Sequence, residues 1–144
     1  MIKGEQGFTL IEMLLVLLVL MTVTGIAIPN YRAFEIEKEE QRYFELLQQD
    51  VYFAQSESYR SKTPIMVVFR EASHSSEVVQ TFRGALLSRK MPESVQLKKT
   101  SNLKEIHFTG NGSISGSGTL NFETSAGIKS IVVHLGKGRV VFSE

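Results

Sequence analysis

The 144-residue sequence contains no cysteine, no tryptophan and only three prolines. The absence of cysteine excludes disulfides, thiolate metal sites and cysteine nucleophiles, and it leaves the redox compartment open. The sequence also lacks a GxSxG nucleophile elbow, a P-loop and a Rossmann fingerprint, and its three histidines do not have the spacing of zinc motifs. We therefore expect no enzyme, no metal site and no other cofactor.

The net charge is only +1, but bases are scarce in one segment of the chain and acids are scarce in another. Residues 30–57 hold seven acids against three bases, whereas residues 58–144 hold twelve bases against six acids. Such an asymmetry usually reports solvation, and it also divides the chain into an acidic segment and a basic head. The length outside the first thirty residues suits one modest globular unit.

Charge is nearly absent from residues 8–28, where Glu12 is the only ionisable side chain. About twenty apolar residues suffice for a helix to cross the hydrocarbon core, so we predict a transmembrane helix over 8–28. Glu12 does not fit an ordinary anchor, because an acid near the membrane interior costs roughly 2.5–3.5 kcal/mol.

Two common explanations of this apolar segment account poorly for its charges. A cleaved secretory signal would have a positively charged start, but the residues before Met13 carry one base, Lys3, and two acids. A single-span anchor, with Lys3 retained in the cytoplasm, leaves Glu12 without a role.

The stretch GFTLIE, residues 7–12, followed by an apolar helix, resembles the leader of type IV pilins and pseudopilins. The resemblance implies that residues 1–7 are a leader, that prepilin peptidase cuts after Gly7, and that the new amino terminus, Phe8, is methylated. It also implies that Glu12 pairs with the terminal amine of a neighbouring subunit and sets the register of assembly. A charge in an apolar setting is tolerable once it is partnered.

Pro29 stands where many pilins interrupt this helix. Proline removes a backbone donor and permits a kink or local unwinding. We predict that the helix continues over 29–63 as an exposed, amphipathic half and ends at Thr63-Pro64. One face of it should pack on the head, since its members recur at helical spacing: Phe44, Leu47, Val51, Ala54 and Ser58.

After Pro64 the pattern changes to short segments rich in β-branched and aromatic residues. We predict strands at 65–70, 77–83, 94–99, 103–109, 119–124, 128–135 and 138–143, with a Gly/Ser loop at 110–118 and a turn at Gly136–Gly138. Residues 64–144 should thus form an antiparallel β head, and the whole an α+β pilin fold. His107 and His134 should point outward, and Ile131, Val133 and Leu135 inward.

The final segment, residues 106–144, resembles the carboxyl-terminal region of GspH/FimT-type minor pilins, and the ending HLGKGRVVF is similar to that of ComGD-type minor pilins of the Gram-positive competence pilus. The resemblance implies a minor pilin that partners other minor pilins and the major pilin. It would lie in the cell membrane with its amino terminus cytoplasmic, and then at the cell surface in a pilus for DNA uptake. A pseudopilin of a type II secretion-like system is the alternative.

The basic head raises a second hypothesis, that the subunit itself binds DNA without sequence preference through phosphate contacts. The candidate residues are Arg89, Lys90, Lys98, Lys99, Lys104, Lys129, Lys137 and Arg139. FimT-type members bind DNA through a Gly-Arg-x-Arg element, and here Gly138-Arg139 is followed by two valines, so the second arginine is replaced. The competing interpretation is a basic face that is simply solvated.

Overall fold

The computed structural model describes residues 8–136 and 138–143. The chain divides into two compact units, Met1–Glu35 and Ile36–Glu144. Within the first unit the described chain is helical from Leu10 onward, and the second unit holds all the strands.

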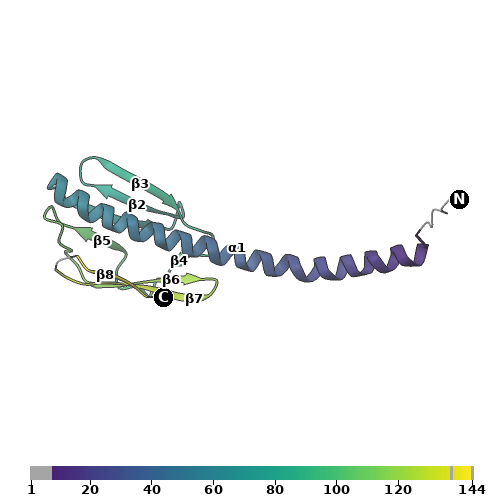
Figure 1. Cartoon of the computed structure of the whole chain (residues 1–144). Coiled ribbons are helices and arrows are strands. Elements are labelled where there is room, and N and C mark those ends of the chain that lie inside the picture. Colours follow the sequence, from purple (N-terminus) through teal and green to yellow (C-terminus); the bar gives the residue numbers. More distant parts are fainter. Residues whose placement is uncertain (1–7, 137, 144) are drawn as a thin grey trace. The chain divides into compact units, whose positions relative to one another are not determined.

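The helix α1 spans Leu10–Ser61 (Figure 1). The helix continues through Pro29 without a break, so the local unwinding that proline permits is not seen, and a kink there stays a prediction. The helix ends before Lys62, which adopts a left-handed φ of 55°, and Pro64 follows two residues later. Proline disfavours helical geometry in the residue before it, which explains why the helix stops here.

The predicted inner face of the helix is confirmed, since all five of its members are buried: Phe44, Leu47, Val51, Ala54 and Ser58. Phe44 contacts Phe122 edge-to-face with ring centroids 5.6 Å apart, and Phe69 contacts the same ring at 5.2 Å. Edge-to-face pairs add about 0.5–1.5 kcal/mol to the gain from burial. One aromatic cluster therefore joins the helix to both sheets of the head.

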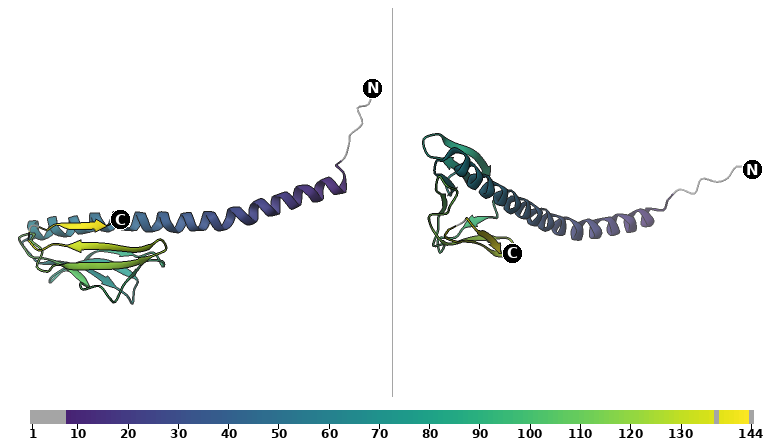
Figure 2. Two further views of the ribbon diagram at one scale, coloured as in Figure 1. Left: turned by 90° about the horizontal axis from the view of Figure 1, so that it is seen from below. Right: turned by 60° about the vertical axis from the view of Figure 1, so that its left-hand side comes forward.

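The head contains two antiparallel four-stranded sheets, which confirms the predicted α+β fold of a long helix on an antiparallel head. The first has the order β3-β2-β1-β5 and the second β4-β6-β7-β8. The strands are β1 Ile65–Arg70, β2 Ser75–Gln80, β3 Gly84–Lys90, β4 Gln96–Leu97, β5 Glu105–Phe108, β6 Gly118–Thr124, β7 Gly127–Val133 and β8 Val140–Ser143. The carboxyl-terminal strands, yellow-green in the left view of Figure 2, run along the half of α1 that belongs to the head, and Phe44 of α1 lines one groove with Ile131 of β7 and Phe142 of β8.

Only the predicted strand 65–70 has its exact bounds; the other six differ at one or both ends, two of them most strongly, and one strand was not predicted. The predicted strand 77–83 is β2, Ser75–Gln80, followed by a turn, and the predicted strand 94–99 is only Gln96–Leu97. The sequence pattern missed β3, because this edge strand is mostly exposed and its residues GALLSRK show no apolar alternation.

The carboxyl-terminal hairpin differs from prediction at one side chain. Ile131 and Val133 are buried and His134 is exposed, as predicted, but Leu135 is 65% exposed. The strand β7 ends at Val133, so the alternation of faces no longer applies two residues later. The Gly/Ser loop at 110–118 is anchored at its middle, where buried Ile114 bridges Phe108 and Gly136.

Candidate functional site

The first turn of α1 is capped by Thr9. The backbone N–H of Glu12 donates to Thr9 Oγ1 at 3.4 Å, and the N–H of Met13 donates to the Thr9 carbonyl at 3.2 Å. A threonine followed three residues later by a glutamate is the pattern of a capping box. Thr9 thus caps the helix start by accepting from the backbone N–H of Glu12, a cap that the sequence analysis did not identify although Thr9-x-x-Glu12 is its signal.

The apolar part of α1 is long and hydrophobic enough to cross a membrane, with a mean hydropathy of 2.5, and none of that stretch is buried within the protein. Phe8 and Leu10 are 75% and 79% exposed at its start. Its two inner threonines are satisfied internally, because Thr22 Oγ1 donates to the Val19 carbonyl at 2.8 Å and Thr24 Oγ1 to the Leu20 carbonyl at 2.6 Å. Internal hydrogen bonds of this kind suit a helix in a medium without water.

The residues predicted to act in processing and assembly, Gly7, Phe8 and Glu12, are close in sequence at this helix start. Phe8 is the first described residue, Glu12 follows one turn later and is exposed, and Gly7 lies outside the described residues. Pro29 lies within α1. The arrangement places a single carboxylate on an otherwise apolar helical surface, where a cation from another chain can reach it.

Arg89, one of the predicted DNA-binding residues, is bound within the protein. Its Nε donates to Asp50 Oδ2 at 2.8 Å and its Nη2 to Asp50 Oδ1 at 3.0 Å, a two-point ion pair that ties β3 to α1. The hydrogen bonds that Arg89 donates to the Asp50 carboxylate raise the pKa of Arg89. Such bidentate pairs are among the stronger polar contacts in proteins. The Arg89 guanidinium is therefore engaged by the helix and is not a free phosphate ligand.

The other predicted DNA-binding residues are distributed over the head. Lys98 and Lys99 follow β4 at one edge of the second sheet, while Arg139 precedes β8 at the opposite edge. Lys90 and Lys104 are exposed at the end of β3 and before β5. Lys137 lies outside the described residues, and Lys129 Nζ lies 5.3 Å from the ring centroid of Phe44. The fold does not gather this set into one groove.

A second carboxylate of α1, Glu40, also turns toward the head. Ser125 donates its backbone N–H to Glu40 Oε1 and its hydroxyl to Glu40 Oε2, both at 2.8 Å. Burial raises the pKa of Glu40, but the hydrogen bonds from Ser125 outweigh it and lower the pKa below its ordinary value. This carboxylate therefore stays ionised and fixes the β6–β7 turn to the helix.

Buried Tyr43 lies between these two polar contacts. Burial raises its pKa to about 12, and the hydroxyl faces Ser76 and the Asp50–Arg89 pair. Among the described residues, no cluster of three or more histidine, aspartate or glutamate side chains is placed to hold a metal ion. The polar groups of the helix face therefore secure the helix to the head.

Comparison with known proteins gives one family and one solved structure. The model of the prokaryotic N-terminal methylation motif matches residues 2–28. The crystal structure of the type IV minor pilin FimU from Pseudomonas aeruginosa (strain PAO1) is similar to this chain with a TM-score of 0.59 and 15% identity, over 77% of this chain and 92% of that one. Comparison with curated protein sequences gives no match. The chain thus combines an N-terminal methylation motif with the type IV pilin fold.

Proposed function

We propose that this protein is a minor pilin that is made as a precursor, cut between Gly7 and Phe8, and built into a thin filament. The observation that carries the proposal is the methylation motif over residues 2–28, at the start of a helix that leads into a pilin-like head. Prepilin peptidase removes residues 1–7 and methylates Phe8. The exposed apolar stretch 8–28 holds the subunit in the membrane, with its amino terminus cytoplasmic, until assembly.

Glu12 sets the register of that assembly. An unpartnered carboxylate in an apolar medium is costly, and cutting after Gly7 creates an ammonium group on Phe8 of each subunit. An ion pair between Glu12 of one subunit and Phe8 of its neighbour removes both costs at one axial position. The exposure of Glu12 at the helix start supports this role.

The filament in which the subunit acts is a competence pilus, and its function is DNA uptake during natural transformation. This finer assignment rests on the likeness of residues 106–144 to ComGD-type minor pilins. Direct DNA binding by the head has less support, because Arg89 is paired with Asp50 and the lysines are dispersed. A pseudopilin of a type II secretion-like system shares the same leader and fold.

Transformation frequency in the native host tests this proposal. Deletion of the gene should reduce transformation at least tenfold, and the wild-type gene should restore it. A Gly7→Val copy, matched in expression, should not restore it and should keep the gel mobility of the precursor. Normal transformation together with a loss of protein secretion would instead support the secretion-system alternative.

A further inference from the structure

The carboxyl end of α1, the residue after it and the β2–β3 turn carry exposed aromatic and cationic side chains outside the basic set considered above. We call them the tip cluster: Tyr59, Arg60, Lys62, Phe82 and Arg83. Lys62 Nζ lies 3.8 Å from the ring centroid of Tyr59. The cluster combines two rings with three cations on one end of the head.

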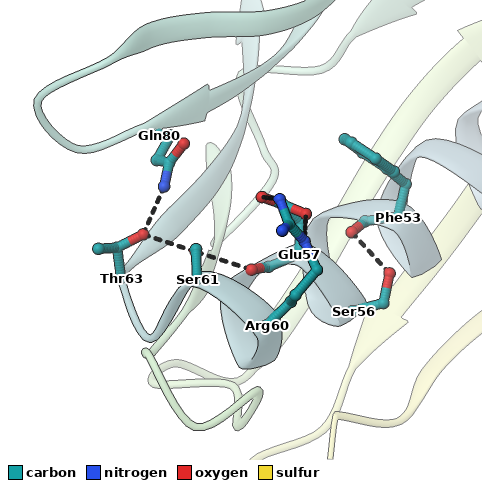
Figure 3. A network of polar contacts seen from close by, with 7 residues as sticks. All are labelled: Phe53, Ser56, Glu57, Arg60, Ser61, Thr63 and Gln80. Carbon is teal, nitrogen blue, oxygen red and sulfur yellow. Dashed lines mark hydrogen bonds and ion pairs between the residues drawn. The ribbon is translucent and has the colours of Figure 1, made fainter.

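Hydrogen bonds hold the β2–β3 turn against the end of the helix. Gln80 Nε2 donates to Thr63 Oγ1 at 2.6 Å (Figure 3). The N–H of Thr81 also donates to the Pro64 carbonyl at 3.2 Å. Arg60 binds Glu57 through Nη2 at 2.6 Å, and Arg60 and then Arg83 lower the pKa of Glu57. The turn and the helix end are therefore one surface.

Phe82 has an unfavourable backbone conformation and an unfavourable exposure of its ring in the isolated chain. The turn is closed by the N–H of Arg83 donating to the Gln80 carbonyl at 3.2 Å, which places Phe82 at its third position with a φ of 73°. That position usually takes glycine or asparagine, and a left-handed bulky residue costs about 1–3 kcal/mol. The ring is also 99% exposed. An aromatic ring held in this way has the character of an anchor for a contact outside the chain.

The other end of the head has a complementary groove of about 420 Å³. We call it the base groove, lined by Ile36, Glu39, Lys90, Met91, Pro92 and Glu93. The apolar part of its lining, which we call the floor, consists of exposed Ile36 with buried Met91 and Pro92. Its rim carries two exposed carboxylates, those of Glu39 and Glu93, and one exposed ammonium group, that of Lys90, so the rim is acidic on balance.

We propose that the tip cluster of one copy docks into the base groove of a second copy, with Phe82 entering the apolar floor and Arg83 facing the acidic rim. The opposite charges of the two surfaces and the match of a protruding ring to an apolar-floored groove carry this inference. The two surfaces differ, so the contact leaves a free tip and a free groove at each end and propagates as an open chain. It rests on the proposed function, because it names a contact between filament subunits.

The proposed contact requires two copies to be displaced along the helix axis, which distinguishes assembled from unassembled protein. The helix rises about 1.5 Å per residue, so residues 36 and 59 lie roughly 35 Å apart along it. Two copies side by side at the same membrane depth hold tip level with tip. Docking therefore requires one copy to advance by that distance, which extension of a filament provides.

Cysteine cross-linking of the full chain in its native host tests the contact without background, since the protein has no cysteine. A Thr81→Cys copy keeps Phe82, and a Ser94→Cys copy places a thiol in the lining of the base groove. Co-expressed copies treated with a short bis-maleimide should give a covalent dimer. A Ser143→Cys copy, exposed on β8, is the matched control and should give at least tenfold less.

Two further substitutions test the chemistry of the contact. Phe82→Ala in the Thr81→Cys copy should lower the dimer yield at least tenfold. Arg83→Glu should lower it similarly, and Glu93→Arg in the other copy should restore it. Failure of the charge exchange to restore the dimer would contradict the ion pairing that the proposal requires.

Three results would overturn the proposal: a dimer yield no higher than the Ser143→Cys control, a Thr81→Cys cross-link only to another protein, or a cross-link that nuclease abolishes. The intact mass of the same sample separates this failure from that of the proposed function. A chain that begins at Phe8 without the dimer contradicts the contact alone. A chain that retains residues 1–7 contradicts the proposed function and the contact with it.

Discussion

Glu12 combines two roles that single substitutions can separate. Its backbone N–H donates to Thr9 in the first turn of α1, while its exposed carboxylate is the one charge on the apolar surface. The first role belongs to the isolated chain and stabilises the helix start. The second role is the one that we propose for the filament, in which the carboxylate would pair with the amino terminus of a neighbour.

Glu12→Gln should prevent assembly while leaving the helix intact, because glutamine can occupy the same position of a capping box but carries no charge. We expect at least tenfold less of this variant in sheared filaments, with membrane insertion and cleavage unchanged. Thr9→Ala is the matched control: it removes the cap, costs about 1 kcal/mol of helix stability, and leaves the charge in place. Normal assembly of Glu12→Gln, or equal failure of both variants, would refute the register role.

Residue patterns predicted some positions well and others not at all. The inner helix face from Phe44 to Ser58 followed from helical spacing, because burial on a helix repeats with its turn. The partner of Arg89 did not, since Asp50 is 39 residues away and only the fold brings them together. The exposure of Phe82 could not be predicted from the sequence either, because its place in a turn depends on where β2 ends.

At the scale of elements, the helix and the head are joined by polar contacts as well as by the apolar core. Glu40 holds the β6–β7 turn, Asp50 holds β3, and Gln55 Nε2 donates to the Gly112 carbonyl at 3.1 Å. A second glycine, Gly138, also lies against Gln55, since a Cβ there would be 1.9 Å from Gln55 Nε2. Glycines in the two loops therefore allow the backbone to approach the helix.

Asp50→Asn should lower the free energy of unfolding by about 1–3 kcal/mol, because it removes a charge-assisted, two-point contact from a side chain that is only 10% exposed. Glu77→Gln is the matched control. Glu77 Oε2 lies 2.5 Å from Nε of Arg70, whose side chain is 52% exposed. Ion pairs open to solvent contribute below about 1 kcal/mol to stability. Chemical denaturation of the full chain in detergent, followed by circular dichroism, measures both.

The element account would be wrong if Asp50→Asn were no more destabilising than Glu77→Gln. That result would mean that β3 is held by its pairing with β2 alone. It would also leave Arg89 available as a phosphate ligand.

Strands at the edges of the sheets were predicted less well from the sequence than strands with a buried face. Strands with buried faces, such as β1 and β7, show the alternation that identifies them. The edge strand β3 is mostly exposed, and β4 is two residues long, so neither produces a clear pattern. Division of the head into two sheets depends on pairings between distant segments, which periodicity does not encode.

At the scale of the whole molecule, the separation of charge along the sequence acquires a structural meaning. Part of the acidic segment is internal, because Glu40 and Asp50 are buried against partners in the head and buried Glu57 pairs with Arg60 on α1 itself. The remaining acids near the base groove and the cations of the tip cluster give the head ends of opposite charge. A subunit with complementary ends and an exposed apolar helix is suited to a filament.

The most direct test of the account is the intact mass of the protein extracted from membranes of its native host. The account predicts a chain that begins at Phe8 and carries one added methyl group, because the methylation motif at residues 2–28 is the foundation of every assembly argument. A chain that retains residues 1–7 would contradict processing. A chain that begins near Ile28 would indicate ordinary secretory cleavage and would remove Glu12 from the mature protein.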